Sequence, residues 1–253
     1  MTTFQSARRA LLAAALLAVT FAAHAGEVTV AVAANFAGPF ARIGEAFTAA
    51  TGHTLKVSSG STGNFYAQIK ASAPFDVLLA ADDETPKKLI AEGLAVPGSN
   101  FSYAIGKLVL WSAQPGLVDD QGAVLAAGKF AHLALANPKL APYGLAGTEV
   151  LKARGLSDAL APRIVTAESI AQAYQFVASG NAELGFVALS QVALPGKPVP
   201  GSYWLVPQAL YGQIRQDAVL LARGEKNPAA VALLAYLKGD AARTLIQSWG
   251  YGL

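Results

Sequence analysis

The regular alternation of short apolar runs with helix-like segments is the feature that most restricts how this chain can fold. Residues 27–33, 53–57 and 75–81 each have the composition of a buried strand, and each is followed by a segment with helical spacing. The first of those segments has phenylalanine and isoleucine on one face and ends at Gly52. Strands that alternate with helices are typical of a parallel sheet covered by helices, so the sequence predicts an α/β fold.

The second part of the chain repeats this order. Apolar runs at 133–136, 163–166 and 184–188 alternate with helical patterns at about 146–154 and 171–178. We therefore expect two lobes, each with a helix-covered and mostly parallel sheet.

Two further strand-like segments lie where the chain would pass between these lobes. The run 106–112 precedes a Pro- and Gly-rich loop instead of a helix, and the run 217–222 precedes two terminal helices. We predict that the first lobe comprises residues 26–108 and 213–253, and the second lobe residues 109–212.

The first 25 residues have the features of a cleaved secretory signal. Arg8 and Arg9 precede an apolar run from Ala10 to Ala23, and Ala23-His24-Ala25 supplies the small residues of a cleavage site. The apolar run is shorter than the roughly 20 residues of a membrane-spanning helix. We expect the mature protein to be exported, soluble and periplasmic.

Composition removes several classes of function. Cysteine is absent, which excludes disulfides, thiolate metal sites and a lipidated N-terminal cysteine as a membrane anchor. Removing Arg8 and Arg9 from 19 basic residues leaves 17 against 16 acidic ones, so the mature chain carries a net charge of +1. That balance gives no reason to expect a nucleic-acid partner. With 53% hydrophobic residues, the chain has enough apolar surface for ordered cores.

Four turns between a predicted strand and the following helix are candidates for a binding site. They contain small, polar and aromatic residues: Ala34-Asn35, Gly60-Ser61-Thr62-Gly63, Pro142-Tyr143-Gly144 and Ser169-Ile170. Ligands of open α/β sheets bind beyond the carboxyl ends of the strands, where these turns lie. The alternative for Ser61 and Thr62 is an exposed turn with a hydroxyl helix cap, and Asn35 has the residue type of an N-cap.

The chemistry of these turns favours an anion without a proton. They offer helix N-termini, hydroxyls, a phenol and the side-chain amide of Asn35, and only Glu168 on their flank is charged. A site without a carboxylate discriminates against hydrogen phosphate, whose proton needs an acceptor. We therefore expect sulfate, molybdate or tungstate, and the spacing of these residues does not choose among them.

Enzyme alternatives have little support in the sequence. No nucleophile-elbow, Walker or dinucleotide pattern is present, and no histidine is placed as a base for Ser61 or Ser169. Asp82-Asp83 follows a strand and suggests either a metal or acid–base site or a helix cap before Thr85. We expect no catalysis and no cofactor.

Several motifs resemble the periplasmic molybdate-binding proteins of ABC importers over nearly the whole mature chain. They are Ala33-Ala34-Asn35-Phe36, the segment 58–69, Ala73-Pro74-Phe75-Asp76-Val77, the segment 103–111, Asn137-Pro138 with Ala141-Pro142-Tyr143-Gly144, and the segment 184–188. The resemblance implies a type II periplasmic-binding fold, with two lobes, two crossing hinge strands and closure on one tetrahedral oxyanion.

The resemblance also implies which residues bind. The oxyanion-binding role falls on Ala34, Asn35, Ser61, Thr62, Tyr143 and Ile170, with Ile170 acting through its backbone N–H. Asn35, Thr62, Tyr143 and Ile170 would contact molybdate oxygens and would not ligate the metal directly. Familiar members have Ser at the position of Asn35 and a binding Tyr at the position of Ala188, so here the phenol would come from Tyr143.

The expected function is a periplasmic receptor that delivers molybdate, and also tungstate, to the membrane permease of an ABC importer. The expected protein is a monomer with neither a membrane anchor nor a nucleic-acid partner. A receptor for sulfate or another small oxyanion, a periplasmic enzyme and a module that has lost its ligand remain the alternatives.

Overall fold

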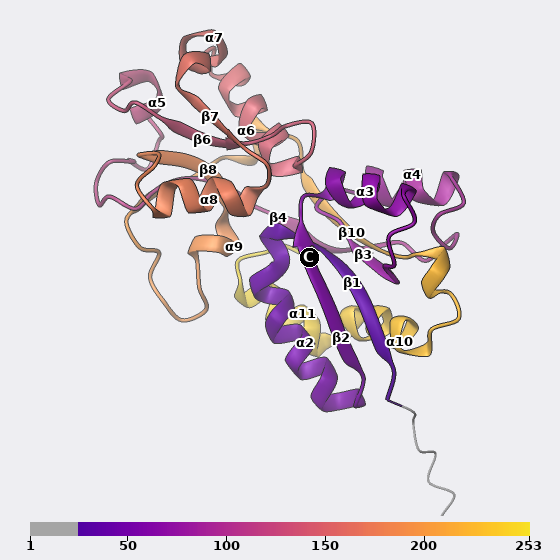
Figure 1. Cartoon of the computed structure of the whole chain (residues 1–253). Coiled ribbons are helices and arrows are strands. Elements are labelled where there is room, and N and C mark those ends of the chain that lie inside the picture. The colour runs from indigo at the N-terminus through magenta and orange to yellow at the C-terminus, as the bar shows by residue number, and fades with distance from the viewer. Residues whose placement is uncertain (1–24) are drawn as a thin grey trace, which may run out of the picture.

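The computed structural model describes residues 25–253 as two lobes, each built on a five-stranded sheet with helices packed against it (Figure 1). The predicted signal, residues 1–25, lies outside the described residues except for its last residue. The two-lobed α/β architecture with chain crossings between the lobes confirms the fold predicted from the strand–helix alternation.

The first sheet has the strand order β2-β1-β3-β10-β4. Its strands are β1 (Glu27–Ala33), β2 (Thr54–Gly60), β3 (Val77–Leu79), β4 (Phe101–Gly106) and β10 (Ile214–Leu220). β1 pairs in parallel with β2 and β3, whereas β10 is antiparallel to β3 and β4. The carboxyl ends of β1 and β2 therefore meet at one edge, where the first two candidate turns lie.

The second sheet has the strand order β7-β6-β8-β5-β9. Its strands are β5 (Leu108–Ser112), β6 (Leu133–Ala136), β7 (Ile164–Ala167), β8 (Leu184–Ala188) and β9 (Ser202–Leu205). β6 is parallel to β7 and β8, and β5 is antiparallel to β8 and β9. The carboxyl ends of β6 and β7 thus present the other two candidate turns at one edge.

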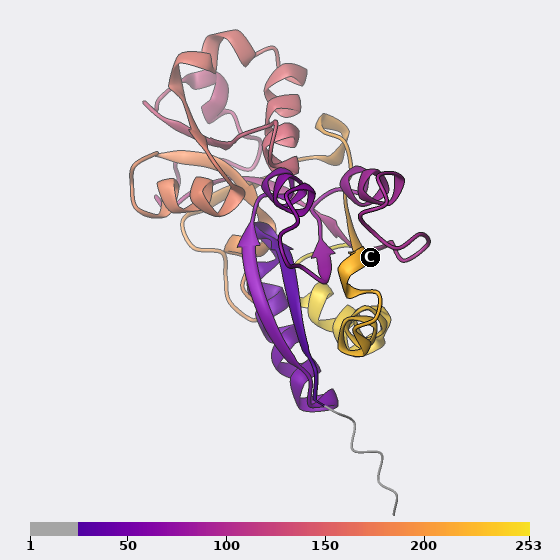
Figure 2. The ribbon, with the colours of Figure 1, turned by 45° about the vertical axis from the view of Figure 1, so that its right-hand side comes forward.

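Helices cover both faces of the first sheet (Figure 2). One apolar core joins that sheet to α2 (Ala37–Thr51), α10 (Pro228–Lys238) and α11 (Asp240–Ser248). A second core on the other face joins it to α3 (Thr62–Lys70) and α4 (Glu84–Ala91). Apolar residues recur on the inner faces of these helices, and their burial holds each helix on the sheet.

The second lobe has one large core around its sheet. The helices of this lobe are α5 (Val124–Ala127), α6 (Pro142–Ala153), α7 (Ser157–Leu160), α8 (Ile170–Ala178) and α9 (Leu189–Val192). Short 3-10 turns occur at Ala34–Phe36, Ala161–Arg163, Gln208–Leu210 and Ala222–Gly224. Among the described helices, none is long and apolar enough to cross a membrane.

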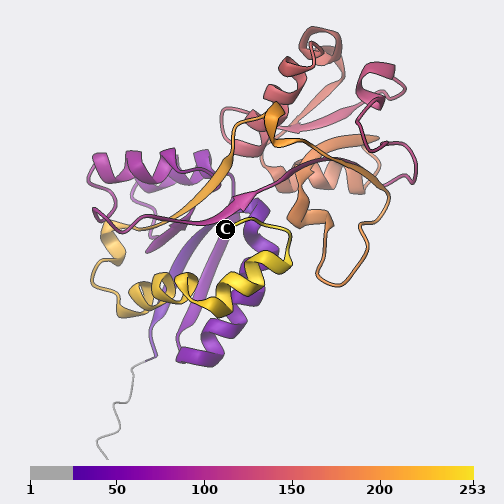
Figure 3. The ribbon, with the colours of Figure 1, turned by 180° about the vertical axis from the view of Figure 1, so that it is seen from behind.

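The chain passes twice between the two sheets, as the view from behind shows (Figure 3). The first passage leads from β4 to β5, and Lys107 separates these strands where the sequence suggested one continuous strand. The second passage leads from β9 to β10, which begins at Ile214, three residues before the strand predicted to start at Asp217. Polar residues at 215–217 hid the start of β10, because an apolar run was the signal for a strand.

The buried carboxylate of Asp76 ties the start of β3 to its neighbours. It accepts hydrogen bonds from the Thr29 backbone N–H at 2.9 Å and the Asn227 amide at 3.3 Å, and it pairs with the Arg223 guanidinium at 2.9 Å. Asp76 is 5% exposed, so loss of its carboxylate leaves donors without an acceptor inside the protein.

We predict that Asp76→Ala lowers the free energy of unfolding by about 2–3 kcal/mol, the scale of orphaned donors to a charged group. Chemical denaturation of the mature protein would measure the change. Asp120→Ala, an exposed aspartate of the second lobe, serves as control and should change stability by no more than about 0.5 kcal/mol. Equal stability of the two variants would contradict the structural role of Asp76.

Candidate functional site

The four candidate turns converge on one cavity between the lobes. The empty volume of this cavity is about 210 Å³, which includes some space open to solvent. The lining comprises Ala33, Ala34, Asn35, Gly60, Ser61, Thr62, Ala81, Ala141, Pro142, Tyr143 and Ile170. All six residues expected to bind an oxyanion are in this set, so the structure brings them together.

Ser61 occupies the N-cap position of α3 but does not cap the helix. Its backbone is extended, with φ −78° and ψ 147°, and no hydrogen bond joins its side chain to the first turn. The residue is 4% exposed, and within residues 25–253 its Oγ is the buried side-chain polar atom without a hydrogen-bond partner. The alternative of an exposed, capping serine is therefore wrong, and this hydroxyl needs an acceptor from elsewhere.

Thr62 lines the cavity, and its hydroxyl accepts a hydrogen bond from the protein. The Ala81 backbone N–H donates to Thr62 Oγ1 at 2.9 Å, and the side chain is 1% exposed. Because this bond fills an acceptor position on Oγ1, the proton of the hydroxyl remains available to a ligand.

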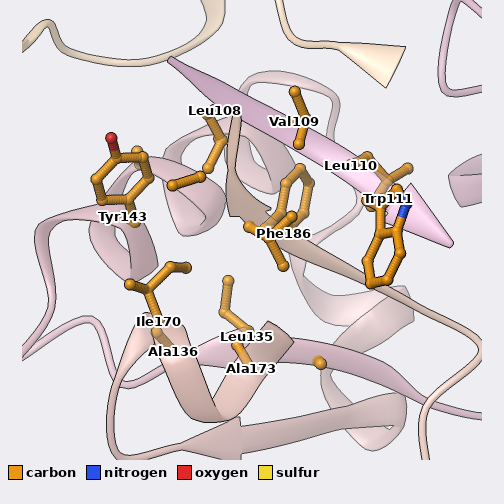
Figure 4. Packing of buried hydrophobic residues seen from close by; sticks show 14 of the residues in the cluster. Leu108, Val109, Leu110, Trp111, Leu135, Ala136, Tyr143, Ile170, Ala173 and Phe186 are labelled. Atoms are coloured by element: carbon orange, nitrogen blue, oxygen red, sulfur yellow. The ribbon is translucent and has the colours of Figure 1, made fainter. Parts of the chain in front are cut away.

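Tyr143 belongs to the first turn of α6. The helix begins at Pro142, before the expected start near Ala146, because proline at the first helical position needs no hydrogen-bond partner. Its ring packs beside Leu108 and Ile170, and its oxygen points away from the apolar cluster (Figure 4).

The Tyr143 phenol keeps its proton at neutral pH. Burial raises the pKa of Tyr143 well above its usual value, and the neighbouring Tyr251 adds to the shift. The Gln216 amide donates to Tyr143 Oη at 3.1 Å. The phenol therefore accepts from the protein and has one proton to donate.

The side chain of Asn35 is neither the predicted helix cap nor a free amide donor. It does not cap α2, whose N-cap position is Phe36, and it lies in a 3-10 turn instead. Both protons of its side-chain amide are engaged, by Gln216 Oε1 and by Tyr251 Oη, each at 2.9 Å. The expected side-chain amide donor is thus already used, and what Asn35 offers the cavity is the N–H of a first helical turn.

Ile170 offers the same kind of donor from the second lobe. It is the first residue of α8, and the N-cap Ser169 accepts from the Gln172 N–H at 3.3 Å. The N–H of the first helical residue has no partner inside the helix, and the partial positive charge of the N-terminus adds to its attraction for an anion.

The cavity is electrically neutral and rich in donors. Among residues 25–253, its lining contains no Lys, Arg, His, Asp or Glu. No group of three or more metal-ligating side chains occurs in this described part of the chain. Hydroxyls and helix N-termini without a counter-charge suit a small anion that only accepts hydrogen bonds.

Both members of the acidic pair near the cavity are engaged at the start of α4. Asp82 accepts from the Thr85 N–H at 2.8 Å, and burial raises the pKa of Asp82 above its usual value. Asp83 forms an ion pair with Lys87 at 2.8 Å. This arrangement favours the capping alternative over a metal or acid–base site.

Direct hydrogen bonds between the lobes bring the two halves of the site together. The Gly63 N–H donates to the Leu140 carbonyl at 2.9 Å, and the Ser190 hydroxyl donates to the Asn35 carbonyl at 2.9 Å. The Ser190 hydroxyl also lies 2.8 Å from the phenol oxygen of Tyr251, a residue of the first lobe. The structure therefore describes a closed arrangement, in which both lobes bound the cavity.

Comparison with known proteins assigns this fold and site to a family. The profile of the bacterial extracellular solute-binding protein family matches residues 28–252. The chain belongs to this family. Membership identifies it as a solute-binding protein rather than an enzyme.

Relatives match the chain over nearly its whole length, and one solved structure has the same fold. A molybdate-binding protein of Azotobacter vinelandii, ModA, is 59% identical over 242 residues, covering 96% of this chain and 95% of the relative. The ModA protein of Rhodobacter capsulatus is 52% identical, covering 99% of both chains. The solved structure of a periplasmic molybdate-binding protein of Azotobacter vinelandii superposes with a TM-score of 0.88 at 47% identity, covering 89% of this chain and 99% of the other.

The structure accounts for the departure at Ala188. That residue is buried at the end of β8, at the N-cap position of α9, and is not part of the cavity lining. The phenol in the cavity is that of Tyr143, from the first turn of α6.

We predict that Gly63→Ala shifts this solute-binding protein toward an open arrangement. A Cβ at Gly63 would lie 2.9 Å from Leu140 Cα and 3.1 Å from the Leu140 carbonyl oxygen, so contact between the lobes would have to loosen. Small-angle X-ray scattering should give a larger radius of gyration than for the wild type. Gly239→Ala, whose Cβ would meet its nearest atom at 3.3 Å within one helix end, is the control, and an unchanged radius in Gly63→Ala would contradict the prediction.

Proposed function

We propose that this protein is a periplasmic receptor that binds molybdate, and also tungstate, in the cavity between its lobes. The proposal rests on the buried donors that meet there from both lobes. Among residues 25–253, no charged side chain lines this place, and the Ser61 hydroxyl has no hydrogen-bond partner. Relatives that are more than half identical over nearly their whole length are named molybdate-binding proteins.

The donor set favours a fully deprotonated dianion. The hydroxyls of Thr62 and Tyr143 each accept a bond from the protein, which leaves each proton available to the ligand. Hydrogen phosphate would place its own proton against these donors and lose at least one hydrogen bond, whereas molybdate, tungstate and sulfate carry no proton at neutral pH.

Size separates the remaining anions. Molybdate and tungstate have nearly the same radius, so a cavity of fixed donors binds both. Sulfate is smaller than molybdate. The donors are fixed on two packed lobes, so they cannot all move close enough to bond to sulfate without straining the closed arrangement.

Binding would act by differential affinity for two states. The open form presents donors from one lobe at a time, and the closed form presents all of them, so the anion shifts the equilibrium toward closure. No bond of the anion is made or broken. We infer that the membrane permease of an ABC importer recognises the closed monomer in the periplasm and receives the anion there.

The experiment that tests this function is calorimetric titration of the mature, ligand-stripped protein with molybdate, tungstate, sulfate and phosphate. We expect tight one-to-one binding of the first two and no measurable binding of phosphate. Tight sulfate binding without molybdate binding would replace the ligand but keep the mechanism. No binding of any of the four anions would refute an oxyanion receptor.

We predict that Thr62→Ala weakens molybdate binding by about 1–2 kcal/mol, the scale of a hydrogen bond to a charged group. Titration calorimetry measures the loss, with Thr62→Ser as the matched variant that keeps the hydroxyl and should stay close to the wild type. If Thr62→Ala and Thr62→Ser bind equally well, the hydroxyl has no part in binding.

We predict that molybdate affinity is nearly constant between about pH 6.5 and 8.5, because the lining residues, all within the described chain, include no group that titrates there. Burial raises the pKa of Tyr143 well above its usual value and that of Tyr251 to about 12, so both phenols stay protonated over this range. Titrations across the range would check it. A tenfold change in affinity would show that a titrating group takes part in binding.

A further inference from the structure

Gln216 is a fully buried polar residue that lies behind the cavity and is not part of its lining. It is 0% exposed and lies on β10, the strand by which the chain returns to the first lobe. The register between β10 and β4 shifts between Gln216 and Asp217. Burying an uncharged amide in the core costs free energy unless its N–H and C=O groups form hydrogen bonds there.

The two ends of the Gln216 amide contact different parts of the site. Its Nε2 donates to Tyr143 Oη at 3.1 Å. Its Oε1 accepts from the Asn35 amide at 2.9 Å and from the Tyr103 phenol at 3.0 Å. The residue thus connects the second-lobe phenol to the first-lobe turn at Asn35.

We propose that Gln216 is a positioning residue that strengthens anion binding in the cavity by fixing the Tyr143 phenol as a donor toward the ligand. This inference rests on the proposed function. A phenol has one proton, and a neighbour that donates to its oxygen leaves that proton to the anion. Without such a neighbour, Tyr143 can turn its proton elsewhere and present a lone pair to the ligand, which an oxyanion disfavours.

The orientation of the amide is held from the first lobe. Asn35 gives one amide proton to Gln216 Oε1 and the other to Tyr251 Oη. The Tyr103 phenol lies within 3.0 Å of both Gln216 Oε1 and the Ala80 carbonyl. With its oxygen facing these donors, Gln216 directs its NH₂ group at Tyr143.

Gly106 leaves the space that this arrangement needs. A Cβ at Gly106 would lie 2.2 Å from Tyr143 Oη and 2.7 Å from Gln216 Nε2. Every other residue type would therefore displace the bond between the two side chains. Gly106, at the end of β4, leaves room for Tyr143 and Gln216 to meet. This is an independent reason to regard the Gln216–Tyr143 hydrogen bond as a structural feature of the site.

A double-mutant cycle tests the inference. Molybdate affinity would be measured by calorimetry for the wild type, Gln216→Met, Tyr143→Phe and the double variant, each checked for folding by thermal unfolding. We expect Gln216→Met to lose about tenfold in affinity, and the double variant to bind no more weakly than Tyr143→Phe alone, because Gln216 acts through the phenol. If the two losses multiply in the double variant, or if Gln216→Met binds like the wild type, the inference is wrong.

A second variant keeps the test decisive if Gln216→Met does not fold. Gln216→Glu retains an oxygen for Asn35 and Tyr103 but replaces the donor to Tyr143 with an acceptor, which draws the phenol proton away from the ligand. We expect it to lose more affinity than Gln216→Met, at least about a hundredfold. Affinity within about twofold of the wild type would overturn the inference.

Two controls separate this inference from the proposed function. Gln213→Met makes the same chemical change on an exposed residue of the segment that leads into β10, and it should bind like the wild type. A wild-type protein that binds none of the oxyanions would refute the function itself. A wild type that binds molybdate while the cycle is additive would refute only the role of Gln216.

Discussion

The binding site between the lobes depends on buried hydrogen-bond donors that face one another across it. Among residues 25–253, these donors have no acceptor for the protons that they offer to the cavity. Within residues 25–253 the Ser61 hydroxyl has no partner, and the hydroxyls of Thr62 and Tyr143 each accept from a donor behind them. Unsatisfied donors in a closed cavity are costly, so the closed state favours whatever supplies acceptors on all sides. A tetrahedral dianion does so, and the lobes, the crossing strands and the close contact at Gly63 bring the donors within reach of it.

Neutrality of the site gives it selectivity. A Lys or Arg in the cavity would attract any anion. Fixed dipoles and hydroxyls instead bind tightly only an anion that accepts hydrogen bonds on every side. The charged groups nearby are engaged elsewhere: Asp82 accepts from the Thr85 N–H in the first turn of α4, and Asp83 pairs with Lys87. The helix N-termini thus attract an anion, and the hydroxyl donors discriminate against anions that carry a proton of their own.

The sequence was sufficient for the fold and for six of the residues that line the cavity, because both depend on local patterns. Strand–helix alternation gives the two lobes, and small polar residues after strands mark the turns at Ser61 and Tyr143. It was not sufficient for the role of Asn35, whose amide is committed to Gln216 and Tyr251, residues 181 and 216 positions away. Contacts of that range are set by how the return strand and the C-terminal segment pack, which no local pattern reports. Gln216 lies between Arg215 and Asp217 near the start of β10, so no sequence pattern set it apart from its polar neighbours.

The most direct test of the account is a crystal structure of the mature protein with molybdate. The account requires one anion between the lobes, with its oxygens within hydrogen-bond distance of Ser61 Oγ, Thr62 Oγ1 and Tyr143 Oη, and of the N–H groups of Asn35 and Ile170. It also requires that no charged side chain contacts the anion. Molybdate held by Lys or Arg at another place, or a Tyr143 phenol turned away from the bound anion, would contradict it.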